Sequence, residues 1–178
     1  FTEVTGISEK YIPKAEIAAV KDNKSGIFTI TLDDGIINHA VTMNNFARKY
    51  GFKFTSYIST KTAIAKDFPT TTWLNLIKGG HMSVGSHGYN HIKITDLNDE
   101  EYYHETVEAV QDLKTFLPGV TFLTYATPYT GPVGRDDIVK DVIYANRSGS
   151  GKGLNPISPN KGAMFNLASF VVKNNTEP

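Results

Sequence analysis

The chain has no cysteine among its 178 residues, which excludes disulfide bonds and metal sites built on thiolates. The formal net charge is zero, because 18 basic residues balance 18 acidic ones. The composition therefore gives no support to a nucleic-acid or acidic-membrane partner. No apolar run approaches the roughly 18 residues that a membrane span requires. What is present, 40% hydrophobic residues in a chain of this length, suits a single globular domain.

The first residues, "FTEVTGISEK", lack the basic stretch and apolar core of a signal peptide. A chain that begins with Phe1 is either processed or trimmed, so we expect that a signal peptide has been removed. The expected location is extracellular, periplasmic or at the cell surface. The lack of cysteine does not decide the compartment.

Strand-like and helix-like patterns alternate along most of the chain. Strand character marks residues 26–32, 52–58, 81–86 and 120–126, and helical spacing marks residues 38–51, 71–80, 98–119 and 135–145. The helix over 98–119 begins with a capping-box-like Asn98 and Glu101, and its expected buried face consists of Val107, Val110, Leu113 and Leu117. Four strand–helix pairs imply parallel strands joined by helical crossovers.

After Ala145 the alternation stops. Residues 146–162 form a long loop rich in Gly, Ser, Pro and Asn, and residues 163–172 resemble one more strand. A complete eight-fold barrel takes about 250 residues. Residues 1–178 are therefore predicted to form a single α/β domain, either an incomplete or distorted (β/α) barrel or an open sheet. We expect a further C-terminal segment or a partner to cover the sheet edge.

Polar residues collect where three of the predicted strands end. The first strand is followed by "DDG" (33–35), the third leads into "SHGYNH" (86–91), and the fourth is followed by "TPY" (127–129). The carboxyl ends of parallel strands share one edge, where α/β proteins bind ligands. We therefore expect the three loops to lie on the same face.

The residue types in these loops suit a divalent metal. Two neutral imidazoles and a carboxylate form a three-ligand set that leaves positions for water and substrate. Adjacent Asp33 and Asp34 point in different directions from an extended backbone, so one can bind metal while the other acts as a base. A divalent metal lowers the pKa of water towards about 7, which favours metal-assisted hydrolysis. Singly, Asp-Asp-Gly is typical of a turn and His-x3-His of a solvated pair, so the prediction depends on their joint appearance.

These residues resemble the motifs of the polysaccharide deacetylase family (carbohydrate esterase family four, the NodB-homology domain). "TLDDG" (31–35) is similar to T-F-D-D-G, "HGYNH" (87–91) has the spacing of H-[ST]-x-x-H, and "ATPY" (126–129) keeps the Pro-Tyr of R-x-P-Y. The motifs occur in the family's order between residues 26 and 135. The resemblance implies a distorted (β/α) barrel with fewer than eight regular repeats.

The resemblance also implies a reaction, a metal-dependent removal of acetyl groups from an acetylated polysaccharide or oligosaccharide. Asp33 is the implied general base, and the implied metal ligands, usually of Zn²⁺, are Asp34, His87 and His91. The backbone N–H of Tyr129 is implied to stabilise the oxyanion together with the metal, and its ring to line the acetyl pocket. Among the implied substrates, N-acetylated sugars are expected ahead of O-acetylated sugars.

The sequence departs from the family at three points. Ala126 stands where many members carry an Arg that holds the base, and Gly88 stands where a Ser or Thr is usual. The late L-x-H motif, whose His protonates the leaving group, has no counterpart because no histidine follows His104. The identity of the general acid therefore stays open. Two alternatives remain: hydrolysis of another C–N bond on the same scaffold, and an inactive carbohydrate-binding relative.

The sequence also allows predictions for the environments of four further residues. Trp73 is predicted to pack in the core, while Tyr89 suits an exposed position or a sugar-stacking platform equally. His39 is expected on the surface, although it follows the Asp-Asp-Gly motif closely. Arg147 is expected to be solvated, with contact to Asp33 or to substrate as the alternative.

Overall fold

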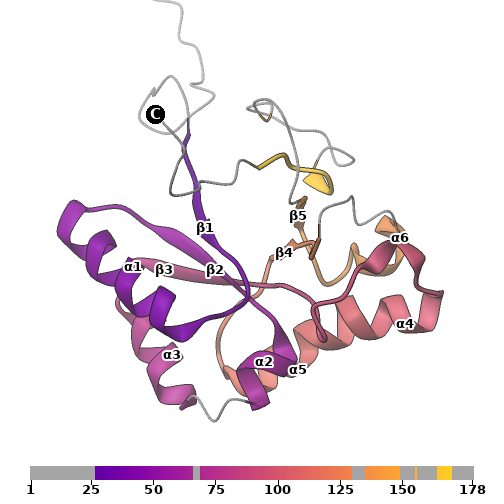
Figure 1. Cartoon of the computed structure of the whole chain (residues 1–178), viewed down its shortest axis with the longest axis horizontal. Helices are drawn as coiled ribbons and strands as arrows, with labels where there is room; N and C mark the ends of the chain where they lie inside the picture. Colours follow the sequence, from indigo (N-terminus) through magenta and orange to yellow (C-terminus); the bar gives the residue numbers. More distant parts are fainter. Residues whose placement is uncertain (1–26, 66–68, 130–134, 149–154, 156–163, 170–178) are drawn as a thin grey trace, which may run out of the picture.

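The computed structural model describes residues 27–65, 69–129, 135–148, 155 and 164–169 (Figure 1). Five strands in this part of the chain form one parallel sheet in the order β1-β2-β3-β4-β5, so that each strand pairs with its neighbours in sequence. They are β1 (Ile30–Leu32), β2 (Phe54–Ile58), β3 (Met82–Ser86), β4 (Thr124–Ala126) and β5 (Ala145–Arg147). The sheet curls into half of a distorted (β/α) barrel, which confirms the predicted fold class.

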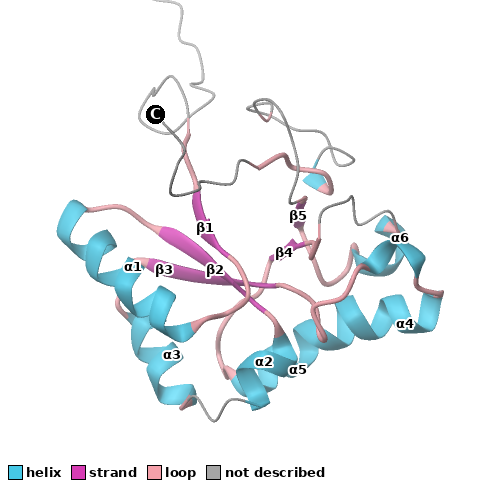
Figure 2. Cartoon of the chain, viewed as in Figure 1, coloured by secondary structure: helices cyan, strands magenta, loops and turns pink. Residues whose placement is uncertain are grey.

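Helices join the strands and lie outside the curled sheet (Figure 2). The α-helices of the described residues are α1 (Ile37–Tyr50), α2 (Thr60–Ala65), α3 (Thr70–Lys78), α4 (Asp99–Tyr103), α5 (Ala109–Phe116) and α6 (Asp136–Val139). A π-helical turn over His104–Glu108 joins α4 to α5, so the three make one continuous rod. Ile94–Asp96 form a 3₁₀ turn before this rod. No helix of the described residues is both long and apolar enough to cross a membrane.

Local sequence signals explain where the helices begin and end. Asn98 and Glu101 form the predicted capping box, in which each side chain accepts the backbone N–H of the other residue at 3.0 Å. Helix α1 ends at Gly51, whose φ of 72° is the left-handed conformation that glycine adopts readily. The predicted buried face is confirmed, since these residues are all at most 2% exposed: Val107, Val110, Leu113 and Leu117.

The core lies between the sheet and these helices. Trp73 is fully buried, which confirms its predicted role in packing. On the other side of the sheet Tyr57 lies across Gly85, where a β-carbon would come within 2.5 Å of the tyrosine ring. Gly85 is therefore needed for this close approach of the tyrosine ring.

The structure corrects the prediction at the weakly patterned segments. The helix predicted over 135–145 is the four-residue α6, and Ala145 begins the unpredicted strand β5. Helix α2 was also missed, because its six residues are too few to show a period. Of the strand predicted over 163–172, Leu167 forms an isolated parallel bridge with Arg147, whereas 163 and 170–172 lie outside the described residues. One domain over residues 1–178 stays a prediction.

Candidate metal-dependent active site

The structure brings Asp34, His87 and His91 together at the carboxyl ends of β1 and β3. The Oδ1 atom of Asp34 lies 3.4 Å from Nε2 of His87 and 3.1 Å from Nε2 of His91. One candidate ligand atom from each residue lies within 4.8 Å of the others. The loops that share this edge thus converge as the parallel topology requires.

These distances fit a divalent metal. Two ligand atoms of a tetrahedral Zn²⁺ site, each about 2.1 Å from the ion, lie roughly 3.4 Å apart. The Nδ1 atom of His87 lies 2.7 Å from the carbonyl oxygen of Ala126, so its N–H donates to that carbonyl and Nε2 is left free to bind. His87 is buried, while the side chain of Asp34 is 51% exposed, so the ligand set opens to solvent on one side.

The electrostatics favour the form of Asp34 that binds metal. The hydrogen bond from His87 lowers the pKa of the Asp34 carboxyl below its ordinary value, and the charges of His87 and His91 lower it further. Partial burial opposes this effect without reversing it. Asp34 is therefore ionised at neutral pH, as a metal ligand must be.

Backbone strain concentrates at the same place. Among the described residues, the non-glycine residues with positive φ are Asp34 (69°), His91 (59°) and Tyr129 (58°). Side chains with a β-carbon adopt this left-handed region rarely, and such residues cluster at functional sites. Two of the three are candidate ligands, and the third packs its ring 5.0 Å from the ring of His91.

Arg147 holds Asp33, the implied base. Its Nη2 donates a hydrogen bond to Oδ1 of Asp33 in an ion pair, and its Nη1 donates to the Ser169 hydroxyl at 3.2 Å. The guanidinium lies 5.2 Å from the ring centre of Tyr57, and the arginine side chain is only 11% exposed. Burial raises the pKa of Tyr57, so its hydroxyl stays neutral beside the arginine. The prediction that Arg147 is solvated is wrong.

The position of Arg147 bears on the departure at Ala126. Strands β4 and β5 pair in register, with Ala126 opposite Arg147. The guanidinium that many family members carry on β4 is thus supplied here by the adjacent strand. Sequence reasoning missed this arrangement because the three residues of β5, "ANR", show no strand pattern.

The remaining candidates lie as follows. Tyr129 is 63% exposed and lies beside His91 at the rim of the site. Tyr89 is only partly exposed, and its ring packs 4.4 Å from the ring of His104. His39 is exposed on α1, as expected. Sequence reasoning overlooked Glu105, which is 2% exposed and accepts hydrogen bonds from the loop between the two candidate histidine ligands. At regular helical spacing Glu105 falls outside the predicted buried face of the 98–119 helix, so the sequence pattern carries no signal for it.

A curated relative matches most of the chain. Over 133 residues the chain is 33% identical to a gellan lyase from a Bacillus species. The match includes 75% of this chain, whereas the chain spans only 5% of the length of that relative.

Solved structures share the fold. A family 4 carbohydrate esterase from Streptomyces lividans, in complex with acetate, is 22% identical with a TM-score of 0.57, and the match covers 68% of this chain and 62% of that chain. A deacetylase from Streptococcus pyogenes, also with acetate, is 15% identical with a TM-score of 0.63, over 74% and 61% of the two chains. The polysaccharide deacetylase family model matches residues 20–144. With its motif residues assembled on this fold, the chain belongs to the polysaccharide deacetylase family.

Proposed function

We propose that this chain is a metal-dependent hydrolase that removes acetyl groups from a polysaccharide. One observation carries the proposal: a base candidate, Asp33, is oriented by Arg147 directly beside the Asp34, His87 and His91 ligand set. A carboxylate base next to an open three-ligand set is the arrangement that hydrolysis of an acyl group needs.

Asp34, His87 and His91 would hold the metal, and we propose Zn²⁺ or another divalent transition metal. When bound, this ion would polarise the acetyl carbonyl and lower the pKa of water. The chain's own residues prepare the site for it. The Ala126 carbonyl fixes the ring of His87, and the Asp34 carboxylate faces both imidazoles.

Asp33 would accept the proton of the attacking water. The ion pair with Arg147 holds one carboxylate oxygen, Oδ1, and leaves the other free to act. The proton that Asp33 accepts is also the one that the leaving nitrogen or oxygen needs as the C–N or C–O bond breaks. Asp33 can therefore return it without a second histidine. The backbone N–H of Tyr129 is proposed to stabilise the oxyanion, since Tyr129 adjoins His91.

We place N-acetyl sugars before O-acetyl sugars as substrates, following the family resemblance. An amine leaves only when it is protonated, and Asp33 would supply that proton. The exposed side chains of Asp34 and Tyr129 suit a polymer that binds across an open face. A polymeric substrate agrees with the proposed location outside the cytoplasm. The relative named gellan lyase supports a carbohydrate polymer as the substrate class.

Acetate release tests the proposal. The Zn²⁺-loaded protein should release acetate from chitin oligosaccharides, more slowly from acetylated xylan, and from neither after chelation. Activity that persists after complete metal removal would contradict the metal role. A metal-loaded protein that binds the oligosaccharides but releases no acetate would instead identify an inactive carbohydrate-binding relative, and release of another C–N product alone would identify the other alternative.

A further inference from the structure

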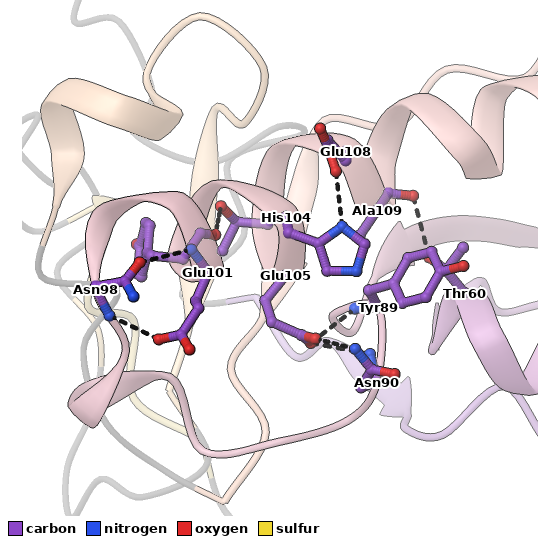
Figure 3. A network of polar contacts seen from close by, with 11 residues as sticks. Thr60, Tyr89, Asn90, Asn98, Glu101, His104, Glu105, Glu108 and Ala109 are labelled. Atoms are coloured by element: carbon purple, nitrogen blue, oxygen red, sulfur yellow. Dashed lines mark hydrogen bonds and ion pairs between the residues drawn. The ribbon is translucent and has the colours of Figure 1, made fainter.

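A buried carboxylate that the proposed reaction does not use lies behind the candidate ligands. Glu105 is 2% exposed and belongs to the π-helical turn. Its Oε2 accepts the backbone N–H of Tyr89 at 3.1 Å and of Asn90 at 2.9 Å, and its Oε1 accepts the Asn90 side-chain amide (Figure 3). Burying a carboxylate is costly unless donors match it, and three donors converge here.

The π-helical turn directs Glu105 inward. Such turns insert one extra residue and occur often at functional sites. The backbone carbonyl of Glu105 also accepts the Tyr89 N–H at 3.2 Å, so main chain and side chain hold the same residue. The neighbouring Glu108 turns the other way, and its Oε2 accepts a hydrogen bond from His104 at 2.6 Å near the surface (Figure 3).

The loop is held from its opposite side by the start of α2. The backbone N–H of Thr60 donates to the Gly88 carbonyl at 3.0 Å, and that of Lys61 donates to the Tyr89 carbonyl at 3.0 Å. The carbonyls of the loop thus face α2 while its amides face Glu105. The two sets of hydrogen bonds fix the path of the chain between the candidate histidine ligands.

We infer that Glu105 is a positioning residue for the metal centre: it holds the backbone between His87 and His91 in the turn that aims both Nε2 atoms at Asp34. This inference rests on the proposed metal site. His91 has the unfavourable φ of 59°, and hydrogen bonds to the two amides before it oppose relaxation of that strain.

The carboxylate of Glu105 and the amide of Asn90 can be exchanged between the two positions by mutation. Lys61 Nζ can only donate, so it fixes Oδ1 of Asn90 on its own side at 3.1 Å and leaves the amide nitrogen facing Glu105. Glu105→Gln replaces one of the two carboxylate oxygens by an amide nitrogen. One acceptor oxygen then remains for the three donors that converge on this side chain. Asn90→Asp places a second carboxylate against Glu105. In the double variant the Gln oxygen accepts the two backbone amides, and its nitrogen donates to the new Asp, which also faces Lys61.

Zn²⁺ affinity of the full chain, measured by competition with a chromophoric chelator, tests the inference. Each single variant should bind Zn²⁺ about 10–100-fold more weakly than the wild type, the range seen when outer partners of metal ligands are lost. The double variant should recover most of that loss. Glu100→Gln, at an exposed position on the same rod, should bind as the wild type does. The visible spectrum of the Co²⁺-loaded protein should change and recover in the same pattern.

The outcomes separate this inference from the proposed function. A wild type that takes up no Zn²⁺ would overturn the metal site and the inference with it. A wild type that binds, together with a folded Glu105→Gln variant of equal affinity, would overturn the inference alone. Failure of the double variant to recover, with all variants equally folded by circular dichroism, would also overturn it. If Glu105→Gln does not fold, Asn90→Asp and the double variant make the same comparison.

Discussion

Arg147 donates a hydrogen bond to Asp33 across 114 residues of sequence, from β5 to the end of β1. The ion pair crosses the open side of the curled sheet and rests on the ring of Tyr57. It supplies the guanidinium that the third family motif lacks here, because β5 places Arg147 beside Ala126. The altered motif is therefore compatible with an active enzyme.

Replacing Arg147 should impair the reaction without releasing the metal. Arg147→Ala frees the Asp33 carboxylate to rotate, and displacement of a reacting group by about 1 Å can cost on the order of 10²-fold in rate. Acetate release should fall on that scale while Zn²⁺ affinity is retained. Arg135→Ala, which removes a partly buried arginine paired with Asp99, is the matched control and should keep the activity.

The register of β4 and β5 suggests a second change that should restore activity to the Arg147→Ala variant. Adding Ala126→Arg to Arg147→Ala moves the guanidinium to the paired position, into space that the first change has vacated. Turnover should recover in part. A double variant as slow as Arg147→Ala, yet equally stable, would show that the adjacent strand cannot substitute.

Asp33→Asn should separate binding from chemistry. The side chain keeps its shape but cannot accept a proton, and removal of a general base typically costs about 10²–10⁴-fold. Zn²⁺ affinity and binding of an oligosaccharide, both measured by calorimetry, should change little. Turnover like that of the wild type in the metal-loaded variant would place the base elsewhere.

His87→Ala should remove most of the metal affinity. The side chain is buried, Ala126 holds its Nδ1, and its Nε2 is one of the three candidate ligand atoms, so the change to alanine removes a ligand outright. The loss should exceed the roughly 10–100-fold expected for an outer partner. His39→Ala, on the exposed side of α1, controls for the general effect of deleting a histidine. Unchanged metal stoichiometry in His87→Ala would contradict the ligand assignment.

Adding a side chain at Gly88 should destabilise the fold, although family members carry Ser or Thr there. Gly88 has a φ of 80°, and a β-carbon would lie 3.1 Å from the Tyr125 hydroxyl. Gly119 has a φ of 78° with nothing within 4 Å, so Gly119→Ala measures the backbone cost alone, about 1–2 kcal/mol. Gly88→Ala should exceed it by about 1–3 kcal/mol in urea unfolding. Equal losses would show that Tyr125 moves freely.

The sequence predicted the ligand set because its signals are local and its geometry is topological. Asp34 follows a clearly apolar strand and the two histidines follow a weaker one, but parallel strands bring their carboxyl ends to one edge. The assignment of the metal to Asp34 rather than Asp33 came from the family resemblance. The capping box and the buried face of the long helix were predictable for the same reason, since each depends on fixed spacing.

Arg147 and Glu105 were not predictable in this way. Arg147 lies in a strand of three residues, too short for alternation to show, and its partner is distant in sequence. Glu105 lies within a helix whose regular period predicts a rod of constant pitch, whereas the π-helical turn shifts the register locally. Both contacts are decided by tertiary packing, which intrinsic preferences do not encode.

The ion pair between β1 and β5 also sets the order of events during folding. The candidate ligands come from loops after β1 and β3 and are held by Ala126 of β4 and by Glu105, so Zn²⁺ can be captured once β1 to β4 and the helical rod have formed. Asp33 is aligned only when β5 docks, and contacts so distant in sequence form late because they close a long loop. During refolding we therefore expect uptake of the ion to precede the return of turnover. The lag between the two should measure how long β5 takes to dock.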